Sequence, residues 1–455
     1  MLESDPNDKT TDERRISLSM RQLGAGALYL LAALVFLAAA RINPWVGALF
    51  KGDRAPDYAD VQWSFFITAV VIGVVIVSFA YRISKGKSWA DGAVLLVVMV
   101  AGLVLADRYL LTHMPPSLWK HDAELHYRHR PGARRGFGQG SIMGVYAINR
   151  WGHHDTEFPR QKPEGEFRAL MLGDSVTMGH GVDYEGTFSA HLEERLRENA
   201  SGYSSFEVIN TGVHGYSTYQ ELQIFEESLP FDPDFVALGF CLNDVVDPFV
   251  LDEEYGGVGL DYHGVNQTPS ALIGWLSNET GAGRLLQSWA LRSRSVEKEK
   301  RAEIYNVRRV AQSSASDPAL QEAWRITLAS LDSVYGLARG HGKAFVLLVF
   351  PFTFQLLDES MREPQRILME HASRHGVDAI DFTPIFARLI FDDPEHLEFL
   401  RARGYSNEDI NDFYMWRIEQ YFWDEDHLTS LGHEVVAEEL FDYLTAKNII
   451  SIRAD

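Results

Sequence analysis

Short apolar runs alternate with helical stretches from residue 167 onward, and this pattern restricts the possible folds more than any other feature. Five runs are each bounded by turn residues, namely Arg168 to Leu172, Glu207 to Asn210, Phe235 to Phe240, Ala344 to Phe350 and Val377 to Asp381. Continuous apolar strands separated by helices are typical of a parallel sheet that is covered on both faces. We therefore predict a three-layer α/β domain at 167–449.

Two long segments interrupt this alternation, at about 250–335 and about 392–421. The first is longer than a single crossover connection needs. The second is acidic and aromatic. Long insertions in a compact domain are usually lids or binding elements, so we interpret both segments as insertions in the α/β domain.

The first quarter of the chain contains three apolar runs, at 23–40, about 63–81 and about 89–111. Each run approaches the ~20 residues that an α-helix needs to cross the hydrocarbon of a bilayer. We therefore predict a cytoplasmic tail at 1–22 and a membrane anchor with three transmembrane helices at 23–111. A cleaved signal peptide is the alternative for the first run, but this run is longer than a typical signal core.

Lysine and arginine residues flank the apolar runs unevenly. Four of them precede the first run, between Lys9 and Arg21, and Arg82, Lys85 and Lys87 lie between the second and third runs. Because positively charged segments stay in the cytoplasm, the chain after the third run is expected outside it. Residues 112–166, rich in Gly, Pro, Arg and His and with one predicted strand at Gly144 to Asn149, are interpreted as a linker and lead-in to the α/β domain.

The composition excludes several classes of function. The formal net charge is -21, and such an acidic chain repels nucleic-acid phosphates. Cys241 is the only cysteine, so neither an intrachain disulfide nor a cysteine-rich zinc site can form. The group His153-His154-Asp155 lacks the i,i+4 spacing of helical metal ligands and is interpreted as a polar turn. We expect no metal and no cofactor.

Three polar motifs directly follow predicted strands. They are Gly173-Asp174-Ser175, the segment Asn210 to Gly215, and Asn243-Asp244. The carboxyl ends of parallel strands meet at one edge of the sheet, where ligands bind. A serine there lies beside backbone N–H groups, and a glycine N–H or an asparagine amide can donate to an oxyanion. Each motif alone is also ordinary turn chemistry.

A fourth motif, Asp424 to His427, precedes a predicted helix near the C-terminus. His427 has the chemistry of a general base, and Asp424 is close enough in a turn to orient its imidazole. Asp426 and His433 are competitors for these roles. His433 opens the amphipathic helix, so we interpret it as structural.

In this order, the four motifs resemble the SGNH hydrolases, also called the GDSL esterase/lipase family. The resemblance covers about Arg168 to Leu444, most of the α/β domain. It implies a flavodoxin-like three-layer α/β/α fold, which agrees with the alternation of strands and helices. The stretch 172–182 is also similar to membrane-anchored bacterial members, which implies a multi-pass protein of the bacterial inner (plasma) membrane with an extracytoplasmic catalytic domain.

The resemblance also implies a role for each matched residue. Ser175 would be the nucleophile, His427 the base and Asp424 the group that orients it. The N–H groups of Ser175 and Gly215 and the side-chain amide of Asn243 would form the oxyanion hole. All five positions carry the required residue types.

Two positions depart from the family pattern. Cys241 stands where many members have a glycine two residues before the asparagine, which affects the shape of that loop. Leu428 follows His427 where proline is frequent. Neither change removes a reacting group.

The expected function is that of a membrane-anchored serine esterase that hydrolyses O-acyl esters, such as acetyl esters, on a cell-envelope glycan or lipid. An O-acyltransferase with the same triad is one alternative, and a catalytically silent binding or assembly protein is another. The expected partners are the acylated carbohydrate or lipid and the bilayer. The acyl chain, the acceptor, the oligomeric state and any protein partner stay open.

Overall fold

The chain divides into two compact units in a computed structural model. One unit comprises 1–116 and 271–289, and the other comprises 117–270 and 290–455. The structure describes residues 22–23, 25–37, 59–85, 89–113, 118–122, 124–139, 142–245, 280–283, 296–313, 317–392, 394–403 and 406–453.

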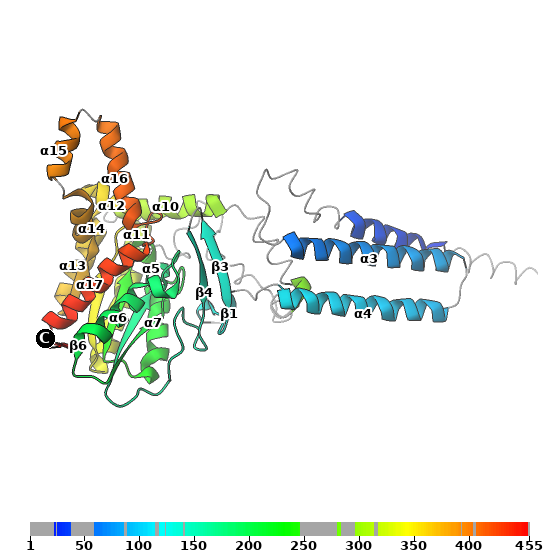
Figure 1. Ribbon diagram of the computed structural model, residues 1–455, viewed down its shortest axis with the longest axis horizontal. Helices are drawn as coiled ribbons and strands as arrows, with labels where there is room; N and C mark the ends of the chain where they lie inside the picture. Colours follow the sequence, from blue (N-terminus) through cyan, green and yellow to red (C-terminus); the bar gives the residue numbers. More distant parts are fainter. Residues whose placement is uncertain are drawn as a thin grey trace, which may run out of the picture. The chain divides into compact units, whose positions relative to one another are not determined.

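The first unit is helical in its described part. Residues 25–37 form a helix, and α3 (Ala59–Ser84) and α4 (Trp89–His113) lie side by side (Figure 1). In the described part of the chain, no helix has both the length and the apolar character needed to cross a membrane. The three transmembrane helices predicted at 23–111 are therefore not supported. Residues 38–58 and 86–88 of this region, and the side chains of 59–69 and 89–99, lie outside the described part.

The second unit is built on a five-stranded sheet in which every pair of neighbours is parallel. In sheet order the strands are β10 (Asp378–Asp381), β9 (Ala344–Val349), β8 (Phe235–Phe240), β5 (Glu166–Gly173) and β7 (Ser205–Asn210). The five predicted apolar runs are these five strands. Renumbered along the chain, the order is 2-1-3-4-5, the flavodoxin-like order, so the predicted parallel α/β fold is confirmed.

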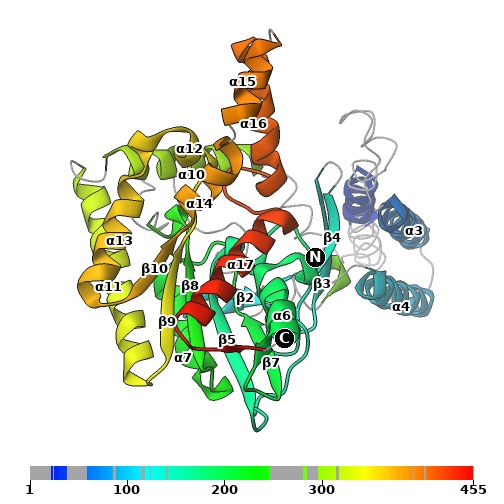
Figure 2. The same ribbon diagram turned by 60° about the vertical axis from the view of Figure 1, so that its left-hand side comes forward.

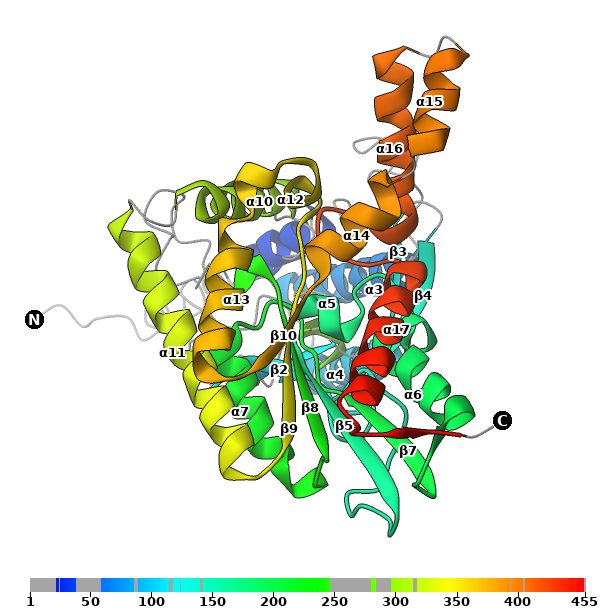
Figure 3. The ribbon, with the colours of Figure 1, turned by 90° about the vertical axis from the view of Figure 1, so that its left-hand side faces the viewer.

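Helices cover both faces of this sheet (Figures 2 and 3). On one face α6 (Phe188–Asn199) packs against α17 (Ser430–Ala446). The other face carries α7 (Thr218–Ser228), α11 (Pro318–Gly340) and α13 (Glu363–His375). The whole length of β5 is buried, because it lies inside the sheet and between the two helix layers.

Two antiparallel hairpins precede the sheet, where a linker and lead-in was expected. They pair β1 (Trp119–Asp122) with β2 (His126–His129), and β3 (Arg134–Gln139) with β4 (Ile142–Ala147). Their buried side chains, which include Tyr127 and Tyr146, belong to the same hydrophobic core as the sheet. This stretch is therefore part of the folded unit.

The two predicted insertions differ in what the structure describes. Of the first, 250–279, 284–295 and 314–316 lie outside the described residues, and its last part forms α10 (Val296–Ser313) and most of the layer helix α11. The second forms α15 (Pro394–Ala402) and α16 (Asn407–Tyr421), a helical hairpin that projects from the unit (Figure 3). The remaining elements are β6 (Ala200–Ser201), α12 (Thr353–Leu357), α14 (Phe382–Phe391), β11 (Ser451–Ile452) and the short 3-10 turns η1 (Tyr184–Gly186), η2 (Leu229–Phe231) and η4 (Glu359–Met361).

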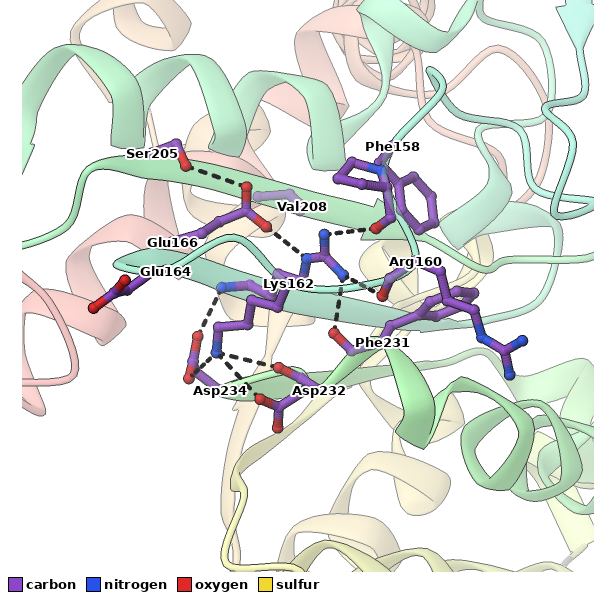
Figure 4. A network of polar contacts seen from close by, with 12 residues as sticks. Phe158, Arg160, Lys162, Glu164, Glu166, Ser205, Val208, Phe231, Asp232 and Asp234 are labelled. Atoms are coloured by element: carbon purple, nitrogen blue, oxygen red, sulfur yellow. Dashed lines mark hydrogen bonds and ion pairs between the residues drawn. The ribbon is translucent and has the colours of Figure 1, made fainter.

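A buried arginine fixes the first half of β5. The side chain of Arg168 is 0% exposed, and its Nε donates to Glu166 Oε1 at 2.7 Å. Its two terminal nitrogens donate to the backbone carbonyls of Pro159, Arg160 and Phe231 at 2.7 to 3.1 Å (Figure 4). The guanidinium thus ties the segment before β5 and the turn η2 to the strand that leads to Ser175.

Candidate active site

The turn after β5 holds Ser175 at the start of the short helix α5 (Ser175–Met178). Asp174 caps this helix, because its Oδ1 accepts a hydrogen bond from the Val176 N–H at 2.9 Å. Gly173 has a φ of +151°, and a Cβ added there would lie 2.0 Å from Thr177 Oγ1. Local packing thus requires glycine and favours aspartate before the serine.

The loop before α17 places His427 against this serine. His427 Nε2 lies 2.9 Å from Ser175 Oγ, although 252 positions separate the two residues. On the other side of the ring, Nδ1 lies 2.9 Å from both carboxylate oxygens of Asp424. Asp424 is itself held in place, since its Oδ1 accepts from the backbone N–H of Asp426 at 3.2 Å and of His427 at 2.9 Å.

Asn243 reaches the same place from the next strand of the sheet. It lies in the turn η3 (Leu242–Val245), directly after β8, and its Nδ2 donates to Asp174 Oδ2 at 2.9 Å. This bond uses one of the two amide hydrogens and leaves the other for a ligand. Because β5 and β8 flank the point where the strand order reverses, Ser175 and Asn243 both lie where α/β sheets bind ligands.

Gly215 belongs to a loop that is tied to α5. Asn210 Nδ2 donates to the carbonyl of Thr177 at 2.9 Å, and Asn210 Oδ1 accepts from the Gly212 N–H at 3.0 Å. Gly215 has a φ of +66°, a left-handed conformation that favours glycine. The neighbouring His214 contacts His180, whose ring centroid lies 4.4 Å from that of His427. The loop therefore borders the group of reactive residues.

The arrangement suits nucleophilic acyl transfer. A hydroxyl is hydrogen-bonded to an imidazole, and the imidazole is hydrogen-bonded to a carboxylate. The GDSL-like Lipase/Acylhydrolase family matches residues 171–435 of the chain, which span every one of these groups. The chain belongs to this family. It is accordingly a serine hydrolase that acts on ester bonds.

Solved structures of hydrolases are similar to this chain at low sequence identity. A lipase/acylhydrolase from Enterococcus faecalis aligns over 64% of this chain and 100% of its own, with 12% identity and a TM-score of 0.34. A catalytic mutant of an acetylxylan esterase from Geobacillus stearothermophilus aligns over 61% and 94%, with 15% identity and a TM-score of 0.32. A sequence comparison with curated proteins gives no match.

The charged groups of the site act mainly on the pKa of His427. Burial disfavours the charged form of this imidazole, but the carboxylates of Asp426 and Asp424 outweigh burial and raise the pKa of His427 to about 10. Asp426 contributes from a distance of 3.4 Å between its Oδ1 and His427 Nδ1. The neutral imidazole, which is the form that accepts a proton, therefore becomes more populated as the pH rises.

Asp174 is the third carboxylate beside this imidazole. Burial raises the pKa of Asp174, while the hydrogen bonds from the Asn243 amide and the Val176 N–H oppose this rise. Its negative charge is one of those that favour protonation of His427. Asp174 therefore connects the helix cap, the asparagine amide and the charge state of the base.

Sequence reasoning missed the aromatic side chains near His427 and His180, namely Trp423 and Tyr146. Trp423 has its ring centroid 5.6 Å from that of His427, and its Nε1 donates to the His180 carbonyl at 2.8 Å. Tyr146 of β4 accepts from the Gly181 N–H at 2.9 Å and lies 3.1 Å from His180 Nδ1. His180 lies in the stretch 172–182, which the sequence analysis had singled out. Tyr146 lies in the segment that was interpreted as a linker.

Other residues singled out in the sequence have structural positions. His433 is fully buried, and burial lowers its pKa to about 3, so it stays neutral. His154 Nδ1 donates to the carbonyl of Met178 at 2.9 Å, and Asp155 Oδ2 accepts from the Asn210 N–H at 2.9 Å. Both therefore hold loops near the site. Cys241 is buried, which raises the pKa of its thiol well above the usual value.

Proposed function

We propose that Ser175 is the nucleophile of this hydrolase, His427 its general base and Asp424 the group that orients the base. The observation that carries this proposal is the hydrogen-bonded series from Asp424 through His427 to Ser175, with 2.9 Å at each step. Because a carboxylate only accepts, His427 Nδ1 carries a hydrogen, and the neutral ring presents the Nε2 lone pair to Ser175 Oγ.

The reaction we propose has two halves. Ser175 Oγ attacks the ester carbonyl carbon as its proton passes to His427 Nε2, and the alcohol then leaves with that proton. Water attacks the acyl-enzyme as one of its protons passes to the same nitrogen. When the bond from the acyl carbon to Ser175 Oγ breaks, this proton passes to Ser175 Oγ and the acid is released. Asp424 and Asp426 stabilise the imidazolium that forms in each half.

An oxyanion hole completes the proposed mechanism. Its donors are the backbone N–H groups of Ser175 and Gly215 and the Nδ2 of Asn243. The bond from Asn243 to Asp174 supports this assignment, because it fixes the amide before substrate arrives. A fixed donor of this kind typically contributes about 10² to 10³ in turnover.

For the substrate we propose O-acyl esters, such as acetyl esters, of a cell-envelope glycan or lipid. This rests on the expected location, an inner-membrane protein with the catalytic domain outside the cytoplasm. The support for that location is the sequence alone, through the apolar runs within 23–111 and the lysines and arginines that flank them. Carbonate extraction and protease protection of the full chain in intact cells test it, and a wholly extractable protein would reject it.

The chemistry is tested by ester turnover in the full chain. We expect aryl esters of short acyl chains to be hydrolysed by the unaltered protein and by the Ser360→Ala control, which removes an exposed hydroxyl that donates to Asp358. Ser175→Ala should lose turnover by about 10⁴-fold or more. Retained turnover in Ser175→Ala would reject the assignment of the nucleophile.

Acyl transfer is separated from hydrolysis by product analysis. With an acylated donor and a glycan acceptor, hydrolysis releases free acid at the same rate whether or not the acceptor is present. An acyl-glycan that forms at the expense of free acid would replace the esterase proposal by the transferase with the same triad.

A further inference from the structure

A second group of reactive side chains lies where α11 and α13 meet. Asp332 comes from α11, and His371 and His375 come from the last turn of α13, four residues apart. The two helices lie side by side on one face of the sheet (Figures 2 and 3), and Arg339 of α11 donates to the His375 carbonyl at 2.8 Å. Helices end at the edge of the sheet opposite the carboxyl ends of the strands, so this group lies away from Ser175.

Both histidines point at one oxygen atom. The Nε2 of His371 lies 2.8 Å and the Nε2 of His375 lies 3.1 Å from Oδ1 of Asp332. The two ring centroids are 4.4 Å apart. The three atoms therefore converge on a small region instead of forming separate pairs.

Both ring nitrogens of His375 face an oxygen atom. His375 Nδ1 lies 2.9 Å from the carbonyl of His371, and because a carbonyl only accepts, this nitrogen carries the hydrogen. The Nε2 of His375 approaches the same carboxylate oxygen as the Nε2 of His371 does. A cation bound there would have two imidazole nitrogens and one carboxylate oxygen as ligands.

The separations from Asp332 Oδ1 are near those between two ligands of one metal ion. Ligand atoms bound tetrahedrally at ~2.0 to 2.1 Å lie about 3.3 Å apart. The separations of 2.8 and 3.1 Å lie just below that value, and all three candidate ligand atoms lie within 4.8 Å of one another. A hydrogen bond from Nδ1 to a backbone carbonyl is also the usual way in which proteins orient a metal-binding histidine.

We propose that Asp332, His371 and His375 form a binding site for one divalent transition-metal ion of the zinc class, which links α11 to α13. Two imidazoles and one carboxylate favour such ions over Mg²⁺ and Ca²⁺, which take oxygen ligands. The fourth position is open to water, since His375 and Asp332 are both partly exposed.

Some of the groups around the site favour cation binding, and others oppose it. Burial lowers the pKa of His371, although the hydrogen bond to Asp332 and the charge of Asp332 oppose this effect. The C-terminal end of α13 carries partial negative charge, which favours a cation. Arg374 and Arg339 oppose it, but Arg374 is exposed and Arg339 donates to the end of the helix.

Zinc titration of the chelator-treated full chain tests this site. We expect one equivalent of Zn²⁺ to bind by calorimetry, and Co²⁺ in its place to give the visible absorption of a tetrahedral site. Saturating Zn²⁺ should raise Tm by about 5 °C at a hundredfold excess over Kd. Mg²⁺ and Ca²⁺ should change neither quantity.

Two variants and a matched control identify the ligands. His375→Ala and Asp332→Asn should each weaken Zn²⁺ binding at least about tenfold. His341→Ala is the control, because His341 is also exposed at the end of a helix and its Nδ1 also lies 3.0 Å from a carbonyl four residues earlier. It should bind Zn²⁺ as the unaltered chain does.

The alternative metal-binding group among the described residues is Asp424, Asp426 and His427. Zinc bound there would inhibit ester hydrolysis in proportion to its occupancy. The His375→Ala substitution would not change this binding. That outcome, or the absence of any saturable Zn²⁺ binding, would overturn the proposal. Neither result depends on whether Ser175 is the nucleophile.

Discussion

The two ends of β5 hold buried charges in opposite ways. In its first half, the positive Arg168 faces one carboxylate, Glu166, and its remaining bonds go to backbone carbonyls. After its last residue, three carboxylates surround one imidazole, that of His427. The first arrangement pairs one cation with one carboxylate, whereas the second places three carboxylates around one imidazole.

This difference separates a structural role from a chemical one. The Arg168–Glu166 pair is buried and hydrogen-bonded, so neither group exchanges protons during a reaction. Its role is to hold the strand against the neighbouring backbone. An excess of carboxylates around an imidazole raises its pKa and stabilises the charge that develops during catalysis. The strand β5 is thus held by Arg168 near its start, and it is followed by the reactive Ser175 at its end.

Replacing the orienting carboxylate should have the largest effect. We expect Asp424→Asn to lower kcat/KM for an aryl ester by about 10⁴, because the amide favours the wrong tautomer of His427. Steady-state kinetics measure this loss, with the exposed Asp442→Asn of α17 as the control. A loss smaller than tenfold would show that Asp424 does not orient the base.

A substitution in the first half of β5 should lower the free energy of unfolding without changing kcat. Arg168→Met leaves the buried Glu166 without its partner, and we expect the free energy of unfolding to fall by about 3–5 kcal/mol. Urea denaturation measures it, and kcat per folded molecule should stay within about twofold. Adding Glu166→Met should recover part of the loss. An unstable double variant with no recovery would contradict the pairing argument.

Removal of one oxyanion donor should cost less than removal of the orienting carboxylate. Asn243→Ala is expected to lower kcat by about 10² to 10³ with a smaller change in KM, because the donor acts mainly in the transition state. Single-turnover measurements of acylation check this. An effect confined to KM would assign Asn243 to substrate binding instead.

The smallest predicted effect concerns the excess charge itself. Asp426→Asn removes a negative charge 3.4 Å from His427 Nδ1, so the pKa of His427 should fall. Because the neutral imidazole is the base, the acid limb of the pH profile of kcat/KM should move to lower pH, by about one unit. An acid limb that stays in place or moves to higher pH would refute this account of the charge balance.

Much of this site could be predicted because its parts are local in the sequence. The apolar run before Gly173-Asp174-Ser175 predicts a buried strand, and the loop after it follows from cap and glycine chemistry. The order of the motifs then selected Asp424 and His427. Asp426 was predicted only as a competitor for the role of Asp424. Its effect on the pKa of His427 depends on a distance within one turn, which the sequence does not give.

Other features depend on contacts between distant segments. The strands β1 to β3 are short and rich in polar residues, whereas the apolar run in β4 predicts a strand. Only the packing through Tyr127 and Tyr146 shows that both hairpins belong to the core. The spacing of His371 and His375 is visible in the sequence, but their partner Asp332 lies on another helix. The apolar runs at 23–111 predicted membrane spans that the described residues do not support.

The most direct test of the central claim is the site of covalent attack by a fluorophosphonate probe. After labelling of the full chain at several pH values, peptide mass mapping should find a single adduct on Ser175, with a labelling rate that rises toward alkaline pH. An adduct on a different residue, or no adduct in a preparation that still hydrolyses esters, would contradict the account.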